Sequence, residues 1–137
     1  MADANHDLIR TRTLEIQGSM GAFPLVECED FEFTLDRSIE VAVSTAGPIG
    51  FSVDDKGGSF TLNVFATESP EVNWYRVMAS GEAVIFTAQD VNAALEAVGH
   101  RIQYRKAKVE KVDPKTTNTG KQMIVVTGKY LGLRVIA

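Results

Sequence analysis

Apolar and polar residues alternate with a period of two along most of the chain, which is typical of half-buried β-strands. Clear alternation covers residues 31–35, 39–43 and 60–66, and a looser, β-branched run covers 8–16. Turn-forming residues separate these runs at 18–21, 46–48 and 55–58. Among them Gly57-Gly58 is the strongest hairpin signal. The first half of the chain is therefore expected to be a series of strands.

One segment departs from this pattern and predicts a helix over residues 70–80. Ser69-Pro70-Glu71 supplies a capping residue, a proline suited to the first helical turn and an acid that favours the helix dipole. Apolar residues then recur at helical spacing, and Gly81 ends the run. The rings of Trp74 and Tyr75 are expected to cover an open end or face of the sheet, with ligand stacking as the alternative.

The second half returns to β-structure, with strands predicted at 83–88, 101–112, 121–127 and 130–136. The alanine-rich stretch 90–98 predicts a possible second short helix, with a long loop as the alternative. Within 101–112 the apolar phase changes, since Ile102 and Tyr104 share one phase and Ala107 and Val109 the other. This change predicts a bulge near Arg105-Lys106.

Length and composition are those of one ordinary globular domain. The chain has 137 residues, of which 45% are hydrophobic and 23% charged. A single domain over 1–137 is expected, with residues 1–6 flexible and without a signal peptide or membrane span. The lone Cys28 sits between Glu27 and Glu29, which raise a thiol pKa, so we expect an inert strand cysteine suited to a reducing compartment.

Residues that carry catalytic or metal chemistry are sparse. His6 and His100 are the only histidines, so no zinc spacing and no histidine-assisted nucleophile is apparent. The acidic residues at 27–32 alternate between the two faces of a strand, and no glycine motif precedes a helix. We therefore expect no enzyme, no cofactor and no metal site.

Charge is unevenly distributed. Residues 1–68 carry 12 acidic and four basic side chains, while residues 69–137 carry six acidic and ten basic ones, giving −8 and +4. A basic run at 101–111 invites a nucleic-acid interpretation, but the acidic pI of about 5.2 argues against it. The charges either coat a solvated surface or let opposite faces of neighbouring copies meet.

Two stretches resemble a known family. The run from Ser59 to Gly81, a strand followed by a helix opening on Ser-Pro, is similar to the middle of tail tube proteins of long-tailed, especially contractile, bacteriophages. The run from Ala107 to Gly120 is similar to the strand and turn that enter the final hairpin of that family. Residues 89–99 look like an insertion relative to it.

The resemblance implies an antiparallel β-sandwich or split β-barrel with one flanking helix. It also implies hexameric rings that stack into a tube for DNA, as in the related type VI secretion tubes. The expected location is the tail of a virion assembled in the host cytoplasm, and the expected partners are further copies and possible sheath, terminator and baseplate proteins. Alternatives are a small β-barrel ligand-binding or enzymatic domain, or another ring-forming component such as a tail terminator.

Three groups of site residues are expected. The first is suggested by the resemblance, the second by glycines and charges at an exposed loop tip, and the third by the charge split, with Trp74 as an apolar centre. Acidic residues of the lumen wall are expected at Glu32, Asp36 and Glu40. A ring-stacking loop is expected at Gly47, Pro48, Asp54, Asp55, Lys56 and Gly57. A subunit interface is expected at Trp74, Arg105, Lys106, Lys108 and Lys111.

Overall fold

The computed structural model describes residues 11–35, 37–44, 47–55, 57–116 and 120–136, and between 37 and 55 it describes the backbone alone. Asp36, Lys56 and the expected flexible start at 1–6 lie outside these residues. The elements are β1 (Thr11–Gly18), β2 (Gly21–Pro24), β3 (Cys28–Phe33), β4 (Arg37–Ser44), β5 (Gly47–Asp55), β6 (Gly58–Phe65), α1 (Trp74–Ser80), β7 (Val84–Val91), β8 (Ala97–Lys115), β9 (Met123–Tyr130) and β10 (Gly132–Val135).

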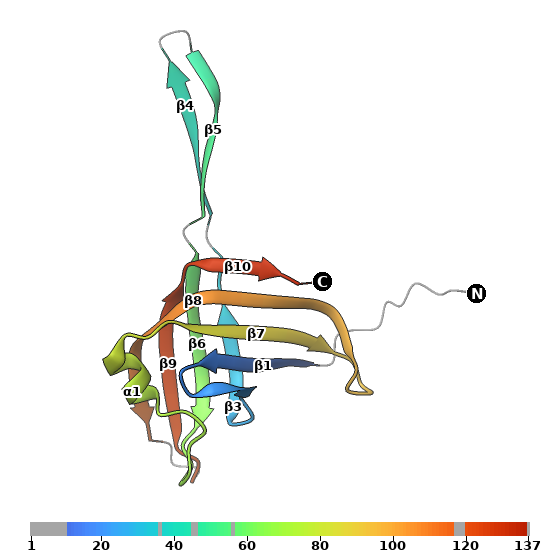
Figure 1. The fold of residues 1–137 in the computed structure, drawn as a ribbon, viewed down its shortest axis with the longest axis vertical. Helices are drawn as coiled ribbons and strands as arrows, with labels where there is room; N and C mark the ends of the chain where they lie inside the picture. The colour runs from blue at the N-terminus through green and yellow to red at the C-terminus, as the bar shows by residue number, and fades with distance from the viewer. Residues whose placement is uncertain (1–10, 36, 45–46, 56, 117–119, 137) are drawn as a thin grey trace, which may run out of the picture.

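Eight strands form one open antiparallel sheet in the order β2-β1-β7-β8-β9-β6-β3, with β10 also paired to β8. The 19-residue β8 pairs with β7 through its first half and with β9 through its second. Figure 1 shows two layers, which we name by their course: a transverse layer of β2, β1, β7, β10 and the first half of β8, and an upright layer of β3, β6, β9 and the rest of β8. The prediction of a mainly β fold with one flanking helix is confirmed.

The core lies between the two layers and follows the sequence alternation. Phe60, Leu62 and Val64 are buried from the upright layer, and Ile16 and Phe86 from the transverse layer. Each such side chain gains roughly 1.5–3 kcal/mol when it leaves water. In β6 only one phase of the strand is buried, so the other phase is free to carry polar residues.

The predicted bulge in β8 is confirmed. Tyr104 lies opposite Phe86 but Ala107 lies opposite Val84, so three steps along β8 match two along β7. Lys106 has a φ of 53° at this point. The extra residue turns the apolar phase over, so that both Tyr104 and Ala107 face the core as the strand passes between layers.

The helix is shorter than predicted and begins at Trp74, because Asn73 rather than Ser69 caps it. The Asn73 side chain accepts a hydrogen bond from the Arg76 N–H at 3.2 Å. Glu71 is instead engaged with the loop before β3, where its carboxylate accepts the backbone N–H of Val26 at 3.3 Å. The end at Gly81 is as predicted, with a left-handed φ of 67°.

The possible second helix over 90–98 is wrong, since β7 runs to Val91 and β8 begins at Ala97. A short turn joins them, in which the Asn92 carboxamide oxygen accepts the N–H groups of Ala94 and Glu96 at 2.9 and 3.0 Å. Asp90, the first residue of the predicted helix, belongs to β7.

The hairpin predicted at Gly57-Gly58 is also wrong, because β5 pairs with β4 and β6 pairs with β3 and β9. Ser44 lies opposite Gly47, and the β4–β5 hairpin projects away from the body (Figure 1). Gly57 and Gly58 lie at the base of this hairpin, where the backbone passes close to other strands. A Cβ on Gly58 would lie 1.7 Å from the Thr34 carbonyl oxygen, so only glycine lets the chain pass there.

Candidate assembly surfaces

Within the described ranges no group of His, Cys, Asp and Glu residues is arranged to hold a metal ion. Nor does the described part of the chain contain a helix long and apolar enough to cross a bilayer. The features that remain are a groove, two charged margins, an exposed apolar strand and the projecting hairpin.

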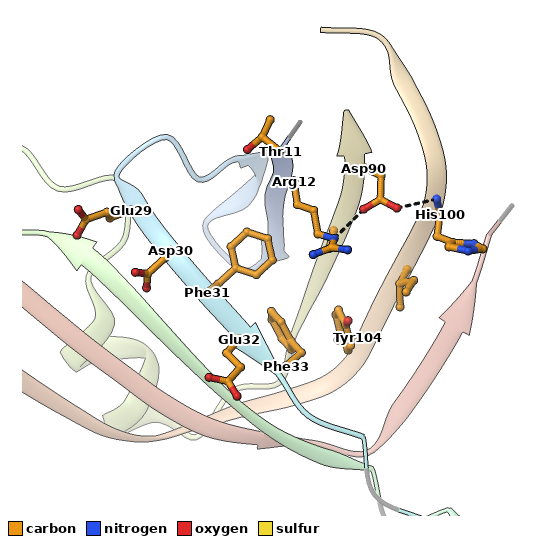
Figure 2. Close-up of a pocket in the computed structure, with 12 residues that line it drawn as sticks. Thr11, Arg12, Glu29, Asp30, Phe31, Glu32, Phe33, Asp90, His100 and Tyr104 are labelled. Atoms are coloured by element: carbon orange, nitrogen blue, oxygen red, sulfur yellow. Dashed lines mark hydrogen bonds and ion pairs between the residues drawn. The ribbon is translucent and has the colours of Figure 1, made fainter. Parts of the chain in front are cut away.

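The groove lies where the two layers part, between β3 and the ends of β1, β7 and β8, and encloses about 620 Å³. Figure 2 shows Phe31 and Phe33 pointing into it from β3. Phe33 stacks on Tyr104 with ring centroids 3.9 Å apart, which closes the inner end. The remaining lining residues are Thr11, Arg12, Glu29, Asp30, Glu32, Ala88, Asp90, His100 and Ile102.

A buried carboxylate forms the far wall. Asp90 is 5% exposed, accepts a hydrogen bond from Arg12 Nε at 2.7 Å and another from the His100 N–H at 3.0 Å (Figure 2). Burial alone would raise its pKa, but the His100 N–H and the Arg12 guanidinium outweigh burial and hold the pKa of Asp90 below its ordinary value. Gly99, with φ of 61°, approaches the carboxylate more closely than a Cβ would permit.

Sequence reasoning missed this cluster, although a signal was present. Asp90 occupies the same strand phase as the buried Phe86 and Ala88, and a carboxylate on an apolar phase needs a partner. The partner, Arg12, is 78 residues away in sequence. Only the antiparallel pairing of β1 with β7 brings them opposite one another.

The pKa of the Cys28 thiol is raised, as expected, but burial is the main cause and the contributing acids are Asp30 and Glu71, not Glu27 and Glu29. Burial, reinforced by the charge of Asp30, raises the pKa of its thiol to about 12, so the thiol stays protonated at neutral pH. It packs against the edge of the core.

Acidic residues gather on the outward phase of β3. Asp30 lies opposite Asn63 and Glu32 opposite Thr61, and both acids are exposed. Of the other two expected lumen residues, Glu40 lies in β4, of which only the backbone is described, and Asp36 lies outside the described residues.

Basic residues gather on β8, where Arg105, Lys106, Lys108 and Lys111 are all exposed. Lys108 lies opposite Lys129 of β9, a residue that the sequence did not single out. Nearby acids pair with part of this charge, with Lys111 Nζ 3.4 Å from Asp113 and Lys129 Nζ 3.6 Å from Glu110.

The outward face of the upright layer therefore runs from an acidic to a basic margin. Its β3 edge carries Asp30 and Glu32, and its β8 edge carries Lys108 and Lys111. The strands between them, β6 and β9, present neutral residues such as Thr61 and Thr127 as neighbours in the sheet. We name these edges the acidic margin and the basic margin.

Trp74 is not part of an exposed interface, contrary to the expectation. It is 3% exposed and lies parallel to Phe86 with centroids 6.5 Å apart, so it fills the core. The first expectation for this ring, that it covers the sheet, is confirmed. Its neighbour Tyr75 is 47% exposed, so the expectation that both rings cover the sheet holds for Trp74 alone.

The expected ring-stacking loop is not a loop either. Gly47, Pro48, Asp54 and Asp55 belong to β5, and Asp55 pairs with Arg37 at the base of the hairpin rather than at its tip. Gly57 lies beyond that base with φ of 71°.

The last strand exposes apolar residues that sequence reasoning did not select. Leu131, Leu133, Val135 and Ile136 are between 38% and 64% exposed. Leu133 lies opposite Tyr104, and Val135 lies opposite Ile102. Because directly opposed residues share a face, these leucine and valine positions continue the apolar floor of the groove.

Comparison with known proteins gave matches among structures alone. No family model matches the chain, and no curated protein matches it. The sheath/tube terminator of the extracellular contractile injection system PVC superposes with a TM-score of 0.66 at 9% identity, over 98% of this chain and 100% of the other. A chain of the PVC sheath–tube complex gives 0.65 at 10% identity, over 99% and 94%.

Hcp1 from Flavobacterium johnsoniae gives a TM-score of 0.57 at 8% identity, over 90% of this chain and 94% of the other. The solid-state NMR and cryo-EM structure of the SPP1 tail tube is among the matches as well. The chain thus has the fold shared by phage tail tube and Hcp proteins, as the resemblance in its sequence predicts.

Proposed function

We propose that this chain is a structural subunit that assembles with its own copies into hexameric rings, stacked as the inner tube of a phage tail. The observation that carries the proposal is the pair of opposite margins on one face of the upright layer. The shared fold with tube and tube-terminator proteins supports it. The role is structural rather than catalytic.

Opposite margins favour a head-to-tail contact. When two copies stand side by side, the acidic margin of one meets the basic margin of the next, for example Glu32 beside Lys108. Such a contact uses two different surfaces, and repeated rotation either closes a ring or continues as a filament. Complementary charge fixes the register of the contact more than its strength.

The hairpin supplies a contact of another kind, between rings. A two-stranded hairpin alone is marginally stable in water, and β4–β5 extends beyond the body that would otherwise support it (Figure 1). Engagement with a neighbouring ring stabilises it and sets the spacing of the stack. The ring-stacking role thus moves from the expected loop to the whole hairpin.

A DNA conduit needs a lumen wall with negative charge. Because Glu32 is engaged in the ring contact, this role falls to the other two expected acids, Asp36 and Glu40, whose charge repels phosphates and lets DNA slide. Sheath, terminator and baseplate proteins are the partners proposed for the outside and the two ends of the tube, with assembly in the host cytoplasm.

Negative-stain electron microscopy of the purified chain tests the proposal. Hollow filaments built from six-fold rings are the expected result. Monomers at every concentration would contradict it, and a dose-dependent thermal shift with a small ligand would then favour a ligand-binding domain using the groove.

A terminator is the second candidate, favoured by the fold match to the PVC terminator. Six-fold rings that never stack, and that cap preformed tubes, distinguish it from a tube subunit.

A further inference from the structure

The groove beside β3 is apolar at its inner end and polar at its wide end. Phe33 stacks on Tyr104 at the inner end, and Phe31, two residues back along β3, lies edge-on to Phe33 with the ring centroids 6.0 Å apart. Phe31 is only half-buried. At the wide end the wall carries Arg12 and Asp90 (Figure 2). The groove therefore suits a group with an apolar body and a polar tip.

Helix α1 carries a side chain of that kind. Trp74 and Val77 are buried in the core, whereas the ring of Tyr75 is 47% exposed and is followed by the exposed Arg76. Tyr and Arg are enriched at the centres of protein interfaces, and a tyrosine combines an apolar ring with a hydrogen-bonding hydroxyl. The exposed side of α1 is therefore suited to contact another protein surface.

The groove and the helix lie at opposite sides of the body. Thr11, at the start of β1, lines the groove, whereas the turn after β1 lies near the end of α1, where the Ser19 N–H donates to the Glu82 carboxylate at 3.3 Å. The groove borders β3, one edge of the upright layer, and α1 packs against β8, which forms the other edge. Figure 1 shows α1 at one side and the end of β7 with the start of β8 at the other.

We infer that α1 of one copy fills the groove of the next copy, with Tyr75 as the residue that enters it. This inference rests on the proposed ring and follows from its contact. The helix lies beside the basic margin and the groove lies beside the acidic margin, so bringing these margins together carries the helix of one copy to the groove of its neighbour. Both features lie on the core side of the upright layer, and they therefore meet on the same side of the contact.

The chemistry of the two surfaces is complementary. The ring of Tyr75 packs against Phe31 and Ile102, which are both half-buried in the single copy. Its hydroxyl lies toward Arg12, whose side chain is 62% exposed and whose guanidinium has N–H donors beyond the Nε group that bonds Asp90. The interface role expected of Trp74 thus belongs to the next residue along the helix.

Site-specific photo-crosslinking tests this contact. Benzoylphenylalanine replaces Tyr75 or, as a matched control, Thr13, which is exposed on the face of β1 opposite to Arg12. Polymers are grown from equal parts of isotopically light and heavy full-length chains. The probe at position 75 is expected to crosslink between chains to residues 29–33 or 100–104, at least tenfold more than the probe at position 13.

The other outcomes are separable. Crosslinks from position 75 within one chain, or between chains to any other surface, overturn this inference while the tube remains. An unmodified chain that never polymerises contradicts the proposed function, and this inference with it.

Substitution covers the case in which the probe itself prevents assembly. Tyr75→Ala is expected to reduce pelletable polymer at least tenfold with the melting temperature of the monomer unchanged, whereas Tyr75→Phe keeps the ring and retains most of the yield. Thr13→Ala, on the far face of the transverse layer, serves as the control and leaves polymer yield unchanged. A wild-type polymer yield for Tyr75→Ala would overturn the inference.

Discussion

Arg12 Nε donates a 2.7 Å hydrogen bond to the carboxylate of Asp90, joining the start of β1 to the end of β7. The two side chains differ in exposure, 62% for Arg12 and 6% for Asp90. The charge of the buried Asp90 carboxylate is therefore stabilised by the exposed Arg12 guanidinium. The two residues lie together in the wall of the groove.

This pair predicts an acid-dependent stability. The folded pKa of Asp90 is lowered, so its contribution is present above the unfolded pKa of about 3.9 and is lost as pH falls through the folded value. Asp90→Asn is expected to lower the free energy of unfolding by about 1–2 kcal/mol at pH 7, and by progressively less as the pH falls below the unfolded pKa and through the lower folded pKa of Asp90. Urea denaturation across pH measures the difference.

Glu15→Gln is the control, because the Glu15–Arg101 pair is exposed and 4.0 Å apart. It should change stability little at any pH. A deficit in Asp90→Asn that is independent of pH would mean that hydrogen-bond geometry, and not charge, stabilises the site.

The core position of Trp74 gives a second prediction. Trp74→Ala removes a buried ring and is expected to cost about 3–5 kcal/mol of unfolding free energy, whereas Tyr75→Ala should stay within about 0.5 kcal/mol. Thermal denaturation of the monomer compares the two. A stable Trp74→Ala monomer that fails to assemble would restore the interface role.

The charged margins predict assembly that weakens with salt, since exposed pairs are screened within about 10 Å at 0.1 M. Changing Lys106, Lys108 and Lys111 to Glu is expected to lower polymer yield sharply at low salt with little effect on monomer stability. Changing the same lysines to Gln should give an intermediate loss. Pelleting assays across a salt series measure yield, and equal yields throughout would show that the charge asymmetry is only a solvated surface.

Shortening the hairpin separates folding from stacking. Removing Val41–Phe51 and joining Glu40 to Ser52 through an Asn-Gly turn keeps the glycines at the base that contact Thr34 and Tyr130. The monomer is expected to keep its melting temperature, because the hairpin adds few contacts to the body, while filaments disappear. Filaments of normal length, seen by electron microscopy, would contradict a stacking role.

Local pattern was enough to predict most strands and the bulge in β8, because alternation and its change of phase are visible in neighbouring residues. It failed where distant residues decide the outcome. The sequence predicts Pro70 as the first helical residue. In the structure the carboxylate of Glu71 bonds the loop at Val26, and the helix begins after its capping residue Asn73.

The site was predictable to a smaller extent for the same reason. The basic residues of β8 were predicted as a group because they are close in sequence and belong to one strand. The groove and the apolar positions of β10 beside it could not be predicted, because they depend on the pairing of β1 with β7 and of Leu133 with Tyr104. The pair Gly57-Gly58 was interpreted as a hairpin turn. The close approach of the Thr34 backbone is a better explanation for glycine at position 58.

The course of β8 has a consequence for how the chain reaches this state. Strand β1 pairs with β7, and β6 pairs with β9. Strands near the N-terminus therefore pair with strands that are synthesised much later. Non-local pairing of this kind slows folding, because loops must close before contacts form. During synthesis the first sixty-odd residues cannot complete a layer until β8 and β9 have left the ribosome. The β4–β5 hairpin is the exception, because its two strands pair with each other and need no later partner, so it can form before the layers that carry it are complete.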